Sequence, residues 1–105
     1  MNHTTEKQAQ LACEIYDLNL QNIDTCLDCL RELEKARPDT TAVINDVERA
    51  KSDYVEHSLH YQSELALMNE SALMAHKERI LNSIGMIASA YLTLVINGMD
   101  GGQDG

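Results

Sequence analysis

The sequence predicts an all-α protein in which long helices pack side by side. Glycine and proline, the residues that most disfavour a helix interior, are absent from residues 5–37 and 39–84, and the single proline, Pro38, separates these two stretches. Apolar residues recur in both at steps of three and four, the period of a helix with a buried side. We therefore expect a long antiparallel helical hairpin plus a third, C-terminal helix, in a bundle that homodimerisation completes.

The first helix is expected over about residues 5–36. Thr5 and Gln8 have the spacing of a capping box, in which each side chain bonds the backbone amide of the other residue. The main apolar stripe comprises Ala12, Ile15, Tyr16, Ile23, Cys26, Leu27, Leu30 and Leu33. A second, narrower stripe comprises Leu11, Leu18 and Cys29. A helix that is apolar on two sides is normally covered by more than one neighbour, which favours a bundle.

Pro38 is expected to end the first helix, because proline lacks an amide proton and disfavours helical backbone at Arg37. The residues that follow, 39–41, are Asp, Thr and Thr, and all suit a helix N-cap. The second helix is therefore expected over about residues 40–68. Because the connection is short, the first two helices should be antiparallel neighbours.

A break is expected at residues 69–71, where the sequence is Asn-Glu-Ser. One helix continuing to residue 97 would be about 85 Å long, far longer than the first helix could cover, and Asn and Ser are good caps. The third helix is expected over about residues 71–97, with Gly98 as its C-cap. Residues 1–98 would then form a single helical domain, followed by a disordered, glycine-rich acidic tail over 99–105.

Net charge narrows the range of partners. The chain has 17 acidic and 8 basic residues, which gives a formal net charge of -9. This charge repels both nucleic acid phosphates and anionic lipids. We therefore expect no direct binding to nucleic acid or membranes. A basic protein partner would be attracted, but the favoured interpretation is that the acidity only keeps a small apolar-rich protein in solution.

Cysteine usage predicts a cytoplasmic protein. The three cysteines form an odd set that cannot close into a complete disulfide framework, and no cationic, apolar signal segment precedes them. The apolar run from Ile80 to Ile96 includes Asn82, Ser83, Ser89 and Thr93, so it is short and polar for a bilayer span of about 20 residues. A membrane segment is not expected.

No residue pattern predicts an enzyme or a cofactor. Serine nucleophile signatures are missing. Cys26 and Cys29 have C-x-x-C spacing, but they are expected inside a helix instead of at its N-terminus, and a second pair of zinc ligands is missing. His57, His60 and Glu64 are candidate metal ligands on one helix face, without the Glu-x-x-His pattern of di-iron bundles. Small core cysteines and surface histidines are the favoured interpretation.

Function is inferred by elimination. A small acidic helical protein without catalytic chemistry is expected to bind another protein, as a chaperone, adaptor or inhibitor that masks its target. Apolar stripes on the first two helices would accept an amphipathic target helix, and the apolar third helix would form the dimer. The residues assigned to a partner or dimer interface are Tyr54, Tyr61, Ile84, Ile87, Tyr91 and Leu94.

Two alternative functions stay open at this stage. A DNA mimic would present carboxylates in a row that imitates phosphates, and the candidate row is Glu14, Asp17, Asp24, Asp28 and Glu34. A metal or redox sensor would use His57, His60 and the cysteine pair. The sequence alone does not identify the partner, the host, or whether the chain pairs with itself or with another subunit.

Overall fold

The structure, a computed structural model, describes the backbone of residues 5–103 and the side chains of residues 5–98. It confirms the all-α prediction, since the described residues contain no strand. The elements are α1 (Glu6–Glu34), the short 3-10 helix η1 (Pro38–Thr40), α2 (Thr41–Glu56), α3 (Ser58–Leu65) and α4 (Glu70–Gln103).

Local side-chain hydrogen bonds define both ends of α1. The Thr5 hydroxyl accepts from the Gln8 amide at 3.0 Å, and the Gln8 side chain accepts from the Thr5 amide at 2.8 Å, which completes the capping box. At the other end, the Thr41 hydroxyl bonds the Pro38 carbonyl and the Glu34 carboxylate. These contacts fix the turn from which α2 begins.

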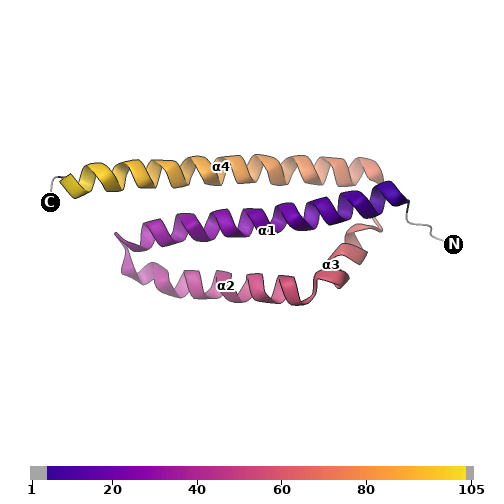
Figure 1. Cartoon of the computed structure of the whole chain (residues 1–105), viewed down its shortest axis with the longest axis horizontal. Helices are drawn as coiled ribbons and strands as arrows, with labels where there is room; N and C mark the ends of the chain where they lie inside the picture. Colours follow the sequence, from indigo (N-terminus) through magenta and orange to yellow (C-terminus); the bar gives the residue numbers. More distant parts are fainter. Residues whose placement is uncertain (1–4, 104–105) are drawn as a thin grey trace.

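The second predicted helix, 40–68, is interrupted at His57, where the backbone leaves helical geometry at φ -103° and ψ 30°. This break was not predicted from the sequence. Backbone hydrogen bonds persist across it, from the His57 amide to the Asp53 carbonyl at 3.0 Å and from the Tyr61 amide to the His57 carbonyl at 3.1 Å. His57 Nδ1 lies 2.9 Å from the same Asp53 carbonyl. After the break, α3 bends away from the axis of α2 and leads the chain toward the start of α4 (Figure 1).

Residues 66–69 carry the chain from α3 to α4. Gln8 of α1 bonds this connection, its side-chain amide donating to the Met68 carbonyl at 2.8 Å. The Asn69 side chain accepts from the Ala72 amide at 2.8 Å and so caps α4. The predicted break at 69–71 overlaps this connection at Asn69, whereas Glu70 and Ser71 already belong to α4.

The helix α4 runs to Gln103, past the predicted end at residue 97 and into the segment 99–105 predicted to be a disordered tail. A left-handed glycine cap at Gly98 would have stopped the helix. No glycine within the described residues has a positive φ, so Gly98 continues the helix instead of capping it.

The helices form a flat layer with α1 in the middle. Figure 1 shows α4 along one side of α1 and α2 with α3 along the other. The molecule measures 65 × 23 × 13 Å, so its thickness is much smaller than its length. The chain alone therefore does not close into the predicted bundle.

The core lies mainly at the N-terminal end of α1, where the connection from α3 to α4 crosses this helix. Leu11 and Ile15 of α1 form a buried cluster with Leu73 and Ile80 of α4, and Leu65 and Met68 pack against it. The complete set of buried apolar residues is Leu11, Ala12, Ile15, Tyr16, Leu27, Ile44, Leu73 and Ile80. At this end of α1, α3 and the connection 66–69 cover the helix in addition to α4.

Candidate functional site

One apolar stripe of α1 is buried at its start and open further along. Ile15 is 0% exposed, whereas Cys26, Leu30 and Leu33, which lie on the same side of the helix at steps of three and four, are only half-buried. The difference arises because α3 and the connection 66–69 cover α1 only near Ile15. Beyond that point α2 and α4 flank α1 on opposite sides (Figure 1). We call Cys26, Leu30 and Leu33 the open stripe.

A shallow pocket of about 240 Å³ lies where the cover of α1 ends. Its lining residues are Asn19, Tyr54, Tyr61, Glu64, Leu65 and Met68. Asn19 lies between Ile15 and Cys26 on the same side of α1, so the pocket continues into the open stripe. Apolar and polar side chains thus meet at the end of the cover over α1.

A stack of three tyrosines fixes the wall of this pocket. The ring centroids of Tyr16 and Tyr54 are 4.7 Å apart, and those of Tyr54 and Tyr61 are 4.8 Å apart. The Tyr54 hydroxyl accepts from the Asn19 amide at 3.1 Å. Burial raises the pKa of Tyr54, so its hydroxyl stays neutral. The stack joins α1, α2 and α3 across the break at His57.

The two tyrosines assigned to an interface therefore already have partners within the chain. Tyr54 and Tyr61 are half-buried, and both line the 240 Å³ pocket. Their role in binding stays a prediction.

The apolar residues of α4 divide between two sides of the helix. Ile84, Ile87, Tyr91 and Leu94, which were assigned to an interface, continue the stripe of buried Leu73 and Ile80 that faces α1, and they are half-buried. A different set lies outside this stripe and is exposed: Leu81, Met86, Leu92 and Ile96. This outer set was not predicted, although its position relative to Leu73 and Ile80 in the helical period was a usable signal.

Residues Glu70–Gly98 of α4 are also long and apolar enough to cross a membrane, and little of this segment is buried. The core helix of a soluble protein can meet the same criterion of length and composition. The expectation of no membrane binding therefore stays a prediction. What the structure establishes is that the outer set of α4 stays exposed among the described residues, while Leu73 and Ile80 are buried against α1.

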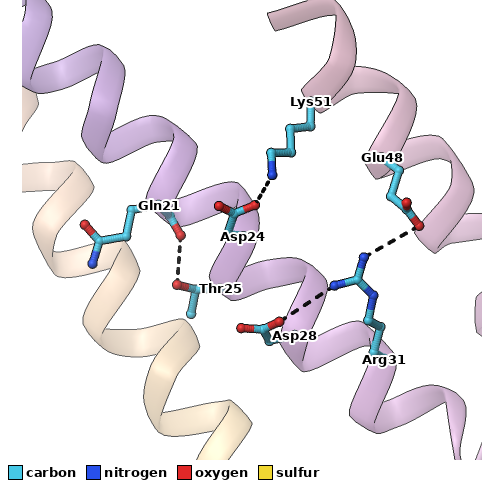
Figure 2. Close-up of polar contacts among 7 residues, drawn as sticks. All are labelled: Gln21, Asp24, Thr25, Asp28, Arg31, Glu48 and Lys51. Atoms are coloured by element: carbon cyan, nitrogen blue, oxygen red, sulfur yellow. Dashed lines mark hydrogen bonds and ion pairs between the residues drawn. The ribbon is translucent and has the colours of Figure 1, made fainter. Parts of the chain in front are cut away.

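Ion pairs neutralise much of the acidic row on α1. Figure 2 shows Lys51 reaching from α2 to Asp24, and Arg31 lying between Asp28 and Glu48. The Arg31 nitrogens lie 3.8 Å from each of these two carboxylates. Exposed pairs of this kind contribute little stability, but they cancel charge locally.

Glu14, at the start of the same row, binds Lys77 of α4 at 2.9 Å. The hydrogen bond from Lys77 holds the pKa of Glu14 below its usual value. Three of the five carboxylates that a DNA mimic would need thus have basic partners, and the Glu34 side chain accepts from Thr41.

Two further shallow pockets of about 600 Å³ each lie along the layer. The first, between α1 and α2, is lined by Leu27, Arg31, Glu48, Lys51, Ser52, Val55 and Glu56. The second, between α1 and α4, is lined by Lys7, Leu11, Ser71, Met74, Ala75, Lys77, Glu78 and Leu81. The second pocket includes Leu81 of the outer set of α4.

The candidate metal ligands do not form one set. His60 Nε2 lies 3.3 Å from Glu64, whereas the ligand atoms of His57, Asp53 and Glu56 gather within 4.8 Å of one another on the exposed surface. His57 Nδ1 is already bonded to the Asp53 carbonyl. This bond, followed by the Asp53 carboxylate, raises the pKa of His57. Exposed acidic groups beside a histidine are common without a metal, and no second observation points to one here.

The cysteines resemble core residues more than reactive thiols. Cys26 and Cys29 are half-buried free thiols, and Cys13 is exposed. Burial raises the pKa of Cys29, and the neighbouring Cys26 adds to the shift. Because the thiolate is the reactive form, this environment lowers the reactivity of Cys29 at neutral pH.

Comparison of the chain with known protein families, curated proteins and solved structures finds no match. A function can therefore be argued only from the surface itself. Its two main features are the open stripe of α1 with the adjoining pocket, and the outer apolar side of α4.

Proposed function

We propose that this cytoplasmic protein binds another protein, as a chaperone, adaptor or inhibitor, by accepting an amphipathic helix of its target on the open stripe of α1. The observation that carries this proposal is the change in burial along one side of α1. Ile15 is fully buried by its neighbours, while Cys26, Leu30 and Leu33 are not. A target helix over these residues would provide the cover that α3 provides over Ile15.

The layer geometry supports a helix as the ligand. The helices α2 and α4 lie on either side of α1 (Figure 1), so a helix placed over α1 would contact three elements and convert the layer into a four-helix arrangement. Its apolar residues would need the i, i+3, i+4, i+7 spacing that recognition by a groove requires. The tyrosine pocket beside Asn19 would receive one of these anchors.

Charge supports a basic target. The net charge is -9, and six of the eight basic residues lie in ion pairs: Arg31, Lys35, Arg37, Arg49, Lys51 and Lys77. The excess carboxylates therefore set the long-range field. Such a field speeds the encounter with a basic partner and slows it at high salt.

We also propose that two copies of the chain pair through α4. The outer apolar side of this helix, which includes Leu81 and Leu92, is exposed in the single chain. A chain of 105 residues buries a limited core by itself, so pairing would add apolar burial that one copy lacks. The two proposed surfaces lie on different helices and can be tested separately.

The alternative functions receive less support. A DNA mimic needs carboxylates that are free to imitate phosphates, but Asp24 and Asp28 are paired with Lys51 and Arg31 (Figure 2). A redox sensor needs a reactive thiol, but burial raises the pKa of Cys29. We therefore retain protein binding as the proposed function.

Target binding can be tested with affinity capture from the native host. Leu30→Asp places a charge on the open stripe, and Val43→Asp places the same charge on an exposed valine of α2 as a matched control. We expect the wild type and the control to enrich the same protein. Enrichment by Leu30→Asp should be lower by a factor of about ten or more, which corresponds to a loss of roughly 1.4 kcal/mol of binding free energy. Circular dichroism should show that both variants remain helical.

A photo-crosslinking residue locates the contact. Placed at Leu30 it should react with the captured protein, whereas at Asp17, on the polar side of α1, it should not. Equal capture by Leu30→Asp and the wild type, or crosslinking only from Asp17, would refute binding at the open stripe.

A further inference from the structure

The outer side of α4 carries a short pattern with two large residues around two small ones. Leu81, Gly85, Ala88 and Leu92 follow one another at steps of four, three and four, so they lie along one side of the helix. Leu81 and Leu92 are 47% and 59% exposed. No atom lies within 4 Å of the position that a Cβ on Gly85 would occupy. Among the described residues, none therefore occupies the space that a side chain at position 85 would fill.

This pattern reads the same in both directions. The order is leucine, small, small, leucine, and its midpoint lies between Met86 and Ile87. A dimer with a two-fold axis requires every contact to occur twice, with the two residues exchanged. If two α4 helices cross antiparallel at this midpoint, Leu81 of one copy meets Leu92 of the other, and Gly85 meets Ala88.

We propose that the occupant of this side of α4 is a second copy of the chain, packed antiparallel in the register that pairs Leu81 with Leu92. This proposal gives a geometry to the pairing through α4 proposed above and rests on it, but it does not depend on target capture by α1. The small residues at the centre let the two helix axes approach closely, and the leucines at either end supply the apolar contact.

Charge favours a second copy at this surface. Each copy carries a net charge of -9, so two copies repel one another wherever their acidic surfaces meet. From Ile80 to Gly98 the sequence has no Asp, Glu, Lys or Arg. The outer side of α4 is therefore the long apolar surface along which two identical acidic chains meet without facing like charges.

The shape of the neighbouring surface agrees with the antiparallel register. This register places Ile96 of the second copy opposite Lys77, beside Met74 and Leu81. These three residues line the pocket of about 600 Å³ between α1 and α4. Ile96 is 57% exposed in the single chain, and the pocket offers its side chain an apolar contact at each end of the dimer.

The first experiment measures mass by analytical ultracentrifugation. The wild type should be a dimer, and Gly85→Leu should be a monomer at the same concentration, because a leucine there separates the two helices. The single chain tolerates this change, since the space is open and leucine is the better helix former. The matched control is Ala90→Leu, which adds the same side chain to an exposed position on the opposite side of α4 and should stay dimeric.

The second experiment tests the register by charge exchange. Leu81→Lys and Leu92→Glu should each be monomeric alone, because each places two unpaired charges in the homodimer. Their equimolar mixture should form a heterodimer, with at least a tenfold higher fraction of dimer than either variant. In this heterodimer the introduced lysine faces the introduced glutamate at one end, and the unchanged Leu92 and Leu81 face each other at the other end. In a parallel register the mixture would only relieve the repulsion between like charges and would form no ion pair, because each introduced charge would face an unchanged leucine.

The two experiments distinguish pairing through α4, the antiparallel register of that pairing, and target capture by α1. A monomeric wild type would overturn pairing through α4 altogether. A dimeric wild type with no rescue in the mixture would overturn the antiparallel register but not the pairing. A monomeric wild type whose α4 variants lose binding to neutral phosphatidylcholine vesicles would show that a bilayer covers this surface instead. Loss of capture in Leu30→Asp bears on the α1 surface alone.

Discussion

Tyr54 stacks on Tyr16 with ring planes only 16° apart, and this contact joins α2 to the buried part of α1. The Tyr16 hydroxyl also donates to the Tyr54 carbonyl at 3.3 Å. On its other side Tyr54 meets Tyr61 of α3, so one half-buried ring holds the two segments on either side of the break at His57. The orientation of α3, and therefore the cover over Ile15, depends on this stack.

We predict that Tyr54→Ala destabilises the fold by about 2–4 kcal/mol, because it removes two ring contacts and a hydrogen bond. Tyr54→Phe should cost only about 1 kcal/mol, since it keeps the ring and loses the bond from Asn19. Urea denaturation followed by circular dichroism measures both values. Equal losses in the two variants would show that the stack contributes little.

The partial burial of the open stripe can be checked by comparing how much two alanine substitutions on this side of α1 lower the free energy of unfolding. Ile15→Ala removes a fully buried side chain and should cost about 2–4 kcal/mol. Leu33→Ala, on the same side of α1 but only half-buried, should cost less than about 1.5 kcal/mol in the chain without its target. The same urea titrations give both numbers. A loss at Leu33 as large as that at Ile15 would mean that another element covers the stripe.

The elements that depend on local sequence could be predicted, and those that depend on packing could not. The capping box of Thr5 and Gln8 needs only residues three positions apart, so the start of α1 could be predicted. The break at His57 could not, because it accompanies the bend that brings Tyr61 onto Tyr54 and carries the chain across α1. A tertiary contact therefore decides this boundary.

The sequence predicts that α4 has an exposed apolar surface, but it does not predict which residues of the helix form that surface. The sequence shows that α4 is apolar on several sides, but the helical period does not say which side α1 occupies. Packing on Leu73 and Ile80 turns Ile84 and Tyr91 inward and leaves Leu81 and Leu92 outside. The single layer of helices, which leaves the open stripe uncovered, likewise follows from the positions of α2 and α4 and not from α1 itself.

The cysteines should differ in their rates of alkylation. Cys13 is exposed and should react first with iodoacetamide at neutral pH. Cys29 should react last, because burial raises the pKa of its thiol and less thiolate is present. Peptide mass spectrometry after short exposures gives the order. In urea the three rates should converge, and a Cys29 that reacts first in the folded protein would contradict a core role.

The last prediction concerns pH and His57. Its hydrogen bond to the Asp53 carbonyl, and then the Asp53 carboxylate, raise the pKa of His57 in the folded protein. A group with a raised folded pKa adds stability that is fully present below its unfolded pKa of about 6.5 and is lost as pH rises through the folded value. The melting temperature of the wild type should therefore fall, relative to that of His57→Gln, as pH rises from about 5 to 8.

Asp53→Asn separates the two causes of this shift. It removes the carboxylate but keeps the backbone carbonyl, which is the larger cause, so the pH dependence relative to His57→Gln should shrink without disappearing. Thermal melts by circular dichroism at each pH, with an NMR titration of the His57 ring, measure the effect. If wild type and His57→Gln gave parallel curves across this range, the ring would not be bonded to Asp53 in solution.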